Sequence, residues 1–257
     1  MGIEMAGNPW LPRRRLISVR EVVVFCFPYA GGSASIYREW VAAEPRDVSF
    51  LPVELPGRST RMKEAPVNDM DRLVQDFVGA CKSELELFDY ALFGHSMGAL
   101  ICIKLLDGLK KCSLPLPQHL FVSGLVPPEA RAVEPLHKLS DEDLIQELRK
   151  MNGTPEEILS NPELIQLFLP ALRSDFALLA SCSPRPLNAI TVPMTVFGGT
   201  HDRLAPPSEM SAWSNLATQG VRHVQFVGDH FFIHAHARDI RREIKVSLAA
   251  SSGAGRS

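Results

Sequence analysis

The sequence predicts one α/β domain in which a mostly parallel central sheet is flanked by helices and carries a helical insertion. Three observations support this. Short apolar runs alternate with helical patterns along the chain, as a parallel sheet covered by helices requires. A Gly-x-Ser-x-Gly pattern, with Ser96 between Gly94 and Gly98, joins one such run to a helix. Two polar side chains of complementary chemistry, Asp202 and His230, follow two late strands.

The composition sets limits on the partners of the protein. The 257 residues include 46% hydrophobic and 22% charged residues, which is ordinary for a chain with one large core. The net charge of −2 provides no electrostatic basis for binding nucleic acid or an anionic membrane. We therefore expect no nucleic acid and no membrane among its partners, and we expect a monomer.

The five cysteines are odd in number, scattered, and without a Cys-x-x-Cys pair. This pattern argues against a disulfide framework or a zinc knuckle, and favours small hydrophobic side chains in a reducing compartment. The amino terminus has no apolar signal core, and no apolar run approaches transmembrane length. A cytoplasmic location is the expectation that follows.

The chain divides into four predicted parts. The arginine-rich residues 1–20 are expected to form a flexible amino-terminal arm, and residues 250–257, rich in serine and glycine, a disordered tail. Between them we expect a core of residues 21–128 and 184–249, interrupted by a helical lid of residues 129–183.

The first core strand is predicted at residues 22–27, a continuous β-prone run suited to burial on both faces. After Pro28 comes a glycine-rich loop whose backbone can approach a ligand with free amide hydrogens. In serine hydrolases of this architecture such a loop supplies the second oxyanion-hole donor, and the residue after the nucleophile supplies the first. Here the donors would be Ala30, with Tyr29 or Gly31 as alternatives, and Met97.

The next elements continue the strand and helix alternation. Residues 49–55 read as a strand, in which Pro52 indicates a sheet edge or a bulge. Asn68 or Asp69 can cap a long helix that runs through Phe88. Its apolar side chains share one face: Leu73, Val74, Phe77, Val78, Cys81 and Leu85.

Residues 89–93 and 99–106 read as the strand and the helix on either side of Ser96. This context favours a nucleophile elbow, a sharp turn that pushes the serine hydroxyl clear of the backbone. Side chains at Gly94 and Gly98 would collide with neighbouring elements in such a turn.

Beyond a strand at residues 119–124, the pattern changes to helices without a strand. Ser140 is a good cap for a helix to Lys150, whereas Pro162 and Pro170 are expected to break the remainder into short pieces. An insertion here would lie over the site as a lid. Its apolar side chains either line an acyl channel or pack within the insertion: Ile145, Leu148, Met151, Leu164, Phe168, Leu172, Phe176 and Leu179.

The last two strands are predicted at residues 192–197 and 221–227, followed by loops that carry Asp202 and His230. The order serine, acid, histidine is the order that α/β-hydrolases use. A serine hydroxyl needs a base within hydrogen-bond reach and an acid that orients the base. Asp202 is favoured as the acid over Asp229, which adjoins His230 in the chain and would need a contorted backbone to hydrogen-bond its ring. Asp175 is a distant third.

His230 is the predicted base among several histidines. His95 adjoins the serine and is expected to be a packing residue, while His201 adjoins the acid. A metal site formed by His230, His234 and His236 is conceivable, but their spacing matches no ligand signature. We therefore expect no metal.

Five motifs together resemble the type II thioesterases: residues 27–32, 55–58, 94–98, 199–202 and 228–231. These enzymes are stand-alone α/β-hydrolases that act with polyketide, nonribosomal-peptide or animal fatty-acid synthases. The similarity runs from about residue 22 to about residue 248. It implies an α/β-hydrolase fold with a helical lid and no diffusible cofactor. It also implies hydrolysis of small acyl thioesters and of acyl groups on the 4'-phosphopantetheine thiol of acyl or peptidyl carrier proteins, for editing or for chain release.

The resemblance also implies the roles of the site residues. Ser96 would attack the thioester carbonyl while His230 takes its proton and Asp202 orients the imidazole. The amides of Met97 and Ala30 would bind the developing oxyanion. Two alternatives remain: a carboxylesterase or lipase that uses the same triad on small-molecule esters, and a non-catalytic binding module with the same fold.

Overall fold

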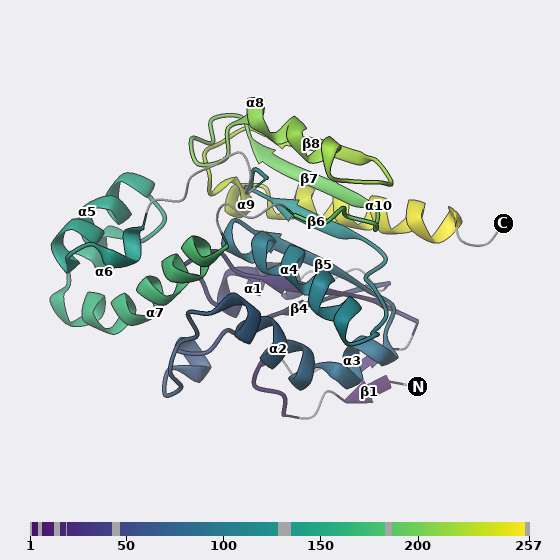
Figure 1. Ribbon diagram of the computed structural model, residues 1–257, viewed down its shortest axis with the longest axis horizontal. Helices are drawn as coiled ribbons and strands as arrows, with labels where there is room; N and C mark the ends of the chain where they lie inside the picture. Colours follow the sequence, from purple (N-terminus) through teal and green to yellow (C-terminus); the bar gives the residue numbers. More distant parts are fainter. Residues whose placement is uncertain are drawn as a thin grey trace.

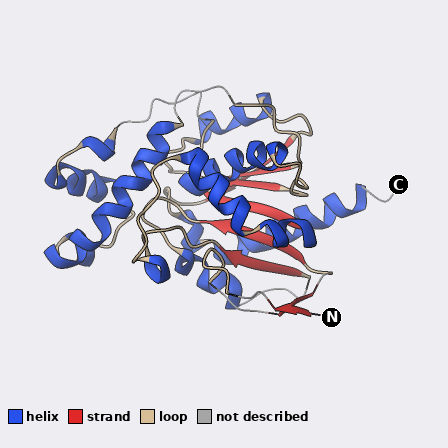
Figure 2. Cartoon of the chain, turned by 60° about the horizontal axis from the view of Figure 1, so that its bottom comes forward, coloured by secondary structure: helices blue, strands red, loops and turns tan. Residues whose placement is uncertain are grey.

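A six-stranded sheet of parallel strands lies at the centre of the protein, with helices on both faces (Figures 1 and 2). The computed structural model describes residues 2–4, 7–12, 16–18, 20–42, 47–127, 135–182 and 187–254. The strand order is β4-β3-β5-β6-β7-β8. The bounds are β3 (Val22–Phe27), β4 (Val48–Pro52), β5 (Tyr90–His95), β6 (Leu120–Ser123), β7 (Met194–Gly199) and β8 (Val221–Phe226).

The helices of the core cover the sheet in two layers. They are α1 (Arg38–Ala42), α2 (Met70–Ala80), α3 (Lys82–Leu87), α4 (Met97–Lys111), α8 (Pro207–Met210), α9 (Phe232–Ala235) and α10 (Ala237–Ala254), with 3-10 turns η1 (Ala34–Tyr37), η2 (Ser59–Arg61) and η5 (Ser211–Asn215).

The apolar runs form buried strands because alternate side chains feed two separate cores. Phe25 and Leu92 pack on one face of the sheet with residues of α2 and α4. Val24 and Phe93 pack on the other face with residues of α1 and α10. The predicted parallel sheet flanked by helices is therefore confirmed.

Two local predictions are confirmed and refined. β4, which ends at Pro52, is an edge strand, so the missing amide hydrogen of proline leaves no ladder position empty. Asp69 caps α2, because its carboxylate accepts from the amide of Arg72 at 2.7 Å. The predicted single helix to Phe88 is instead two, since the chain leaves helical geometry at Cys81 before α3 begins.

The described part of the insertion, residues 135–182, contains helices and a 3-10 turn and no strand. It comprises η4 (Leu136–Lys138), α5 (Asp141–Met151), α6 (Glu156–Leu159) and α7 (Pro162–Ser181), and we call these residues the insertion. Figure 1 shows α5, α6 and α7 beside one end of the sheet. Both predicted boundaries of this part fall near residues 128–134 and 183–186, which lie outside the described residues.

The prediction that the two prolines break the insertion into short helices is confirmed at Pro162, where α7 begins after the short α6, and was wrong at Pro170. Pro162 occupies the first turn of α7, where its missing amide hydrogen leaves no bond unmade. Pro170 lies inside α7 with its side chain exposed, and the helix continues past it for another eleven residues to Ser181. Tertiary packing outweighs the local cost of the proline, because the residues around Pro170 are buried on the opposite face.

The apolar side chains of the insertion divide between two roles. Leu148, Leu172 and Phe176 are buried in a small core that the insertion forms largely by itself. Ile145, Met151, Phe168 and Leu179 pack partly buried against that core, whereas Leu164 is exposed. Packing within the insertion thus accounts for most of these residues.

Helix α7 also corrects the expectation that no apolar run approaches transmembrane length. Among the described residues, it is the one helix long and apolar enough to cross a membrane by length and composition. About half of it, 44% of the apolar stretch, is buried inside the protein. A core helix meets the same criteria, so length and composition alone are weak evidence for a membrane span.

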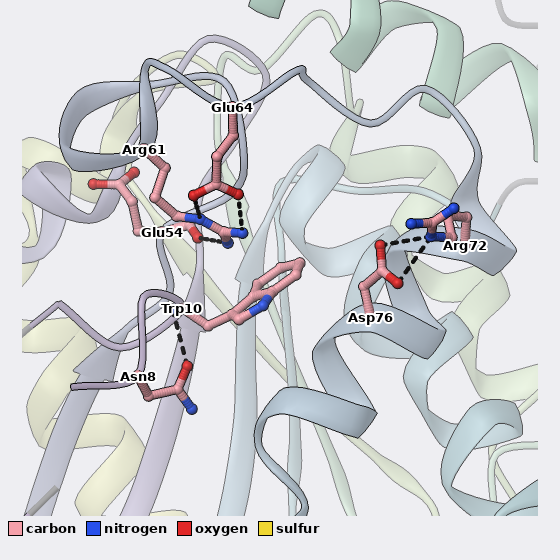
Figure 3. Close-up of polar contacts among 7 residues, drawn as sticks. All are labelled: Asn8, Trp10, Glu54, Arg61, Glu64, Arg72 and Asp76. Carbon is pink, nitrogen blue, oxygen red and sulfur yellow. Dashed lines mark hydrogen bonds and ion pairs between the residues drawn. The ribbon is translucent and has the colours of Figure 1, made fainter. Parts of the chain in front are cut away.

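The amino-terminal residues are not the flexible arm that we predicted. β1 (Gly2–Glu4) pairs with β2 (Leu16–Ser18), and Trp10 is 4% exposed with its ring edge-on to Phe77. The guanidinium of Arg61 lies 4.4 Å from the Trp10 ring centroid (Figure 3). The arm docks because burial of a large aromatic ring stabilises the fold more than ordering the segment costs. The Arg13–Arg15 run lies outside the described residues.

The predicted disordered tail is also corrected. Helix α10 continues to Ala254, and Ser251 hydrogen-bonds to His119 at 3.1 Å. This contact joins the last turns of α10 to the residue that precedes β6. Residues 255–257 lie outside the described residues.

The burial of four of the five cysteines agrees with the prediction that they act as small hydrophobic side chains. Cys26, Cys81, Cys102 and Cys182 are buried, and Cys112 is exposed. Four of the five therefore act as small apolar side chains of the core.

Candidate active site

Ser96 lies between β5 and α4 in a backbone conformation that side chains rarely adopt, with φ of 52° and ψ of −116°. Its amide donates to the carbonyl of Ser123 on the neighbouring strand at 2.7 Å, which holds the turn. A Cβ at Gly94 would lie 2.2 Å from the carbonyl carbon of Gly98, and one at Gly98 would lie 2.2 Å from the carbonyl oxygen of Phe27. The two glycines thus have the steric role that the elbow pattern predicts.

Asp202 and His230 lie in the loops after β7 and β8 and meet directly. Asp202 Oδ2 and His230 Nδ1 are 2.8 Å apart, and the two residues are 3% and 6% exposed. Asp202 Oδ1 also accepts from the amides of Leu204 and Ala205, at 2.8 and 2.9 Å. Three donors therefore hold one carboxylate, which fixes its orientation towards the imidazole.

The rival acids are engaged elsewhere. Asp229 is exposed and its carboxylate accepts from the amide of Phe231 at 2.9 Å, so it caps its own turn. Asp175 lies on α7 and pairs with Arg58, at 2.6 Å between Oδ1 and Nη2. Neither carboxylate reaches the His230 ring.

The other histidines have separate partners. His95 is fully buried, and its Nδ1 lies 2.9 Å from the hydroxyl of Ser123. Burial, with a smaller contribution from His230, lowers the pKa of His95 well below its ordinary value, so this ring is neutral. His234 pairs with the Tyr29 hydroxyl at 3.0 Å, and His236 with the Val227 carbonyl at 2.8 Å. His201 pairs with the neighbouring Thr200 hydroxyl.

The elbow adjoins the histidine loop through His95. The rings of His95 and His230 have centroids 5.1 Å apart, and both approach Gly124 at the end of β6. The hydroxyl of Ser96 has no hydrogen-bond partner in the described part of the chain. Catalytic hydrogen bonds of an unliganded site are often long and shorten when substrate binds.

The two predicted amide donors are free. Neither Ala30 nor Met97 donates its amide hydrogen to an acceptor among the described residues. Gly31, one alternative to Ala30, donates its amide to Asp175 at 2.7 Å and is not available to a ligand. Pro28 and Phe27 lie against Gly98 at the start of α4, so the loop that carries Ala30 passes beside the amide of Met97.

Nothing in the described residues forms a metal centre, since no group of three or more candidate ligands comes together there. What remains is a serine on a strained turn, a buried imidazole held by a carboxylate, and unpaired amides. This set of groups suits acyl transfer.

The sequence predicted no role for Arg58 and considered Asp175 only as a distant alternative to Asp202 as the acid, not as the partner of Arg58. Arg58 belongs to one of the five motifs, at residues 55–58, but no function was predicted for its side chain. The signal that could have found it is an arginine directly after a Pro-Gly turn, because a charge placed there next to core strands needs a buried partner.

Known proteins resemble this chain over most of its length. A family model described as "Thioesterase domain" matches residues 23–248. The gramicidin S biosynthesis protein GrsT of Aneurinibacillus migulanus is 35% identical over 88% of this chain and 89% of its own. The structure of the type II thioesterase BorB from the borrelidin cluster has a TM-score of 0.79 at 33% identity, over 89% of this chain and 93% of its own.

A second solved structure, ClbQ from the colibactin NRPS/PKS pathway, has a TM-score of 0.84 at 29% identity, over 90% of this chain and 98% of its own. These matches confirm the resemblance on which the sequence motifs converge. The chain therefore belongs to the thioesterase family and is a thioester hydrolase of the α/β-hydrolase fold.

Proposed function

We propose that this protein is a type II thioesterase that hydrolyses acyl groups from the 4'-phosphopantetheine thiol of acyl or peptidyl carrier proteins. Ser96 is the nucleophile, His230 the base, and Asp202 the residue that orients the base. The single observation that carries the assignment is the buried contact between Asp202 Oδ2 and His230 Nδ1, in loops adjoining the strained elbow.

The acylation step begins when the Ser96 oxygen bonds to the thioester carbonyl carbon and its proton passes to Nε2 of His230. Asp202 accepts a hydrogen bond from Nδ1 and stabilises the imidazolium that forms. The carbonyl oxygen becomes an oxyanion, which the free amides of Met97 and Ala30 bind. The carbon–sulfur bond then breaks, the thiol leaves with the proton from His230, and the acyl group remains on Ser96.

Deacylation repeats the sequence with water. His230 removes a proton from the attacking water, a second tetrahedral intermediate forms on the same amides, and the proton returns to the Ser96 oxygen as the ester bond breaks. The products are the free carboxylic acid and the intact enzyme. No step needs a metal or a diffusible cofactor.

The proposal extends to partners and location. We expect a monomer, and we place its meeting with carrier proteins in the cytoplasm because scattered and mostly buried cysteines suit a reducing compartment. The relatives support a carrier-protein partner, since GrsT is named for gramicidin S biosynthesis and ClbQ for an NRPS/PKS pathway. The insertion, as a lid over the site, would set which acyl groups enter.

The test of the chemistry is a pair of substitutions. Ser96→Ala and His230→Ala should each lower kcat by on the order of a million-fold, as loss of a nucleophile or its base does in the best-studied serine hydrolase. Unchanged thermal unfolding would show that the fold is intact. Near-normal turnover by purified Ser96→Ala protein would defeat the mechanism.

The test of the substrate compares three panels with the purified enzyme: acyl carrier proteins loaded by chain length, the matching acyl-coenzyme A thioesters, and simple esters. We expect the highest kcat/KM on carrier-bound acyl groups. A clear preference for simple esters would instead identify a carboxylesterase, and turnover of none of them would favour a binding module.

A further inference from the structure

A buried ion pair joins α7 of the insertion to Arg58, which directly precedes η2, and to the glycine-rich loop after β3. Arg58 donates from Nη1 to Asp175 Oδ2 at 2.8 Å and from Nη2 to Oδ1 at 2.6 Å. The Asp175 side chain is fully buried and that of Arg58 is 8% exposed. The same pair grips the glycine-rich loop at two points, because Asp175 Oδ2 accepts from the Gly31 amide at 2.7 Å and Arg58 Nη1 donates to the Gly32 carbonyl at 3.1 Å.

These contacts determine the direction of the Ala30 amide through a short chain of hydrogen bonds. The amide of Gly32 donates to the carbonyl of Tyr29 at 2.9 Å. That carbonyl shares a planar peptide unit with the amide of Ala30, and in a trans peptide the two groups point in opposite directions. The contacts of Gly31 and Gly32 fix the two residues that follow this unit, and the bond to the Tyr29 carbonyl fixes the unit itself, so the Ala30 amide hydrogen is held pointing away from Gly32.

The glycine at position 31 makes this arrangement possible. Its φ is +77°, a conformation that other residues rarely adopt, and a Cβ there would lie 2.6 Å from Leu172 Cδ2 on α7. Helix α7 thus presses against the loop with an apolar side chain and holds it with a carboxylate one turn further along.

We propose that Arg58 and Asp175 are positioning residues that preorganise the Ala30 amide for the oxyanion and couple its direction to the placement of α7. The inference rests on the proposed function, because it assigns the Ala30 amide a role in that reaction. Neither side chain touches the reacting atoms.

A purely structural role is the competing explanation, and buried ion pairs are weak evidence for either. Replacing such a pair by apolar residues of similar volume often leaves stability unchanged, because the two charges no longer have to be desolvated. This behaviour separates the two explanations, since a double variant can keep the fold while it releases the loop.

The experiment uses the double variant Arg58→Met/Asp175→Leu and the single variant Asp175→Asn, whose amide oxygen can still accept from Gly31. We expect the double variant to lose on the order of 100-fold in kcat, the size of effect that a small misplacement of a catalytic group produces. KM should stay within about 3-fold, because an interaction made only in the transition state lowers kcat alone. Asp175→Asn should lie between the double variant and the unmodified protein.

Binding measurements provide a readout that a structural role would not move. An alkylboronic acid forms a tetrahedral adduct on Ser96, with a negatively charged boronate whose oxygen lies in the oxyanion site. The product carboxylic acid binds without forming a tetrahedral adduct. The double variant should lose affinity for the boronic acid by about the same factor as kcat, with the affinity for the carboxylic acid unchanged.

The matched control is Asp141→Asn. Asp141 pairs with Arg173, also on α7, but this pair holds α7 to the start of α5 and does not touch residues 29–32. It should leave kcat and boronic acid affinity unchanged. The inference would be overturned if the control lost as much kcat as the double variant. It would also be overturned if the double variant lost affinity for the boronic acid and the carboxylic acid alike.

Two further outcomes are distinct. If the double variant does not fold, the same two affinities are measured for Asp175→Asn. A lower affinity for the boronic acid alone supports the inference, and an unchanged affinity for the boronic acid overturns it. If Ser96→Ala retains activity, the proposed function fails whatever these variants do.

Discussion

At the scale of single residues, hydrogen-bond partners distinguish side chains that sequence order leaves comparable. Asp202 and Asp229 both lie near His230 in the chain or in space, yet only Asp202 is buried and directed at Nδ1. Asp229 is occupied with the Phe231 amide and faces solvent. The difference decides which carboxylate can set the imidazole tautomer.

Asp202→Asn should therefore lower kcat by roughly ten-thousand-fold, because an amide in this place favours the wrong tautomer, as in another serine hydrolase. Asp229→Asn is the matched control and should keep kcat within a few-fold of the unmodified enzyme, since its side chain only caps a turn. Steady-state kinetics on one acyl thioester compares kcat for the two variants. If Asp229→Asn lowered kcat more than Asp202→Asn, Asp229 would be the acid that orients His230.

At the scale of elements, the elbow depends on how closely α4 approaches β3. A Cβ at Gly98 would overlap the carbonyl group of Phe27, a backbone group that cannot move away without displacing the strand. Gly98→Ala should lower the free energy of unfolding by on the order of 3 kcal/mol, the upper part of the range for overpacking. Urea unfolding measures the loss.

Gly79→Ala is the control for this substitution. Gly79 lies on α2 with nothing within 4 Å of an added Cβ, so alanine there should raise the free energy of unfolding by about 0.5–1 kcal/mol through helix propensity. Similar effects of both substitutions would mean that the close approach of α4 to β3 is not what limits position 98.

A second element contact predicts acid sensitivity. His119, at the start of β6, bonds to Thr195 on β7 at 2.9 Å and to Ser251 on α10 at 3.1 Å. Burial, and secondarily the charge of Arg222, lowers the pKa of His119 to about 4 from an ordinary value of 6.5. The folded state therefore favours the neutral ring.

The sign of the effect follows from linkage. Because the unfolded chain binds the proton more readily, the stabilisation is fully present above pH 6.5 and is lost as the pH falls through 4. The loss amounts to on the order of 3 kcal/mol across that window. His119→Gln should reduce the change in the free energy of unfolding between pH 7 and 4.5, as measured by urea unfolding. Substitution of the exposed His223 should leave that change as it is.

At the scale of the whole molecule, the amino-terminal residues complete one of the two cores. Trp10, Leu11 and Ile17 pack with α2 and β3, and the amide of Glu54 donates to the Trp10 carbonyl at 2.9 Å. Trp10→Ala should lower the free energy of unfolding by about 3–5 kcal/mol, the usual cost of removing a large buried ring.

The control lies in the same region (Figure 3). Arg72 and Asp76 form an exposed pair one turn apart on α2, so Arg72→Ala should change stability by less than about 0.5 kcal/mol. Denaturant unfolding compares the two variants. If Trp10→Ala lowered the free energy of unfolding no more than Arg72→Ala does, the amino-terminal residues would behave as the flexible arm that the sequence predicted.

The amino-acid sequence by itself determined the elements that depend on residues close together in the chain. Apolar runs located the six strands of the central sheet, and the glycines around Ser96 located the elbow. Ser140 located one helix start, and the choice of Asn68 or Asp69 located another to within one residue. The motif order also placed the chain in its family. These features depend on residues that are neighbours in the chain, so composition and spacing carry them.

Tertiary structure alone decided which distant groups meet. Arg58 and Asp175 are separated by 117 positions, and Gly31 and Asp175 by 144. That Gly31 gives its amide to α7, that α7 continues through Pro170, and that Trp10 joins the core all follow from packing. The physical reason is that burial of apolar side chains can outweigh the local conformational preference of a segment. The residues that bury a segment are distant in the chain, so the segment's own sequence does not identify them.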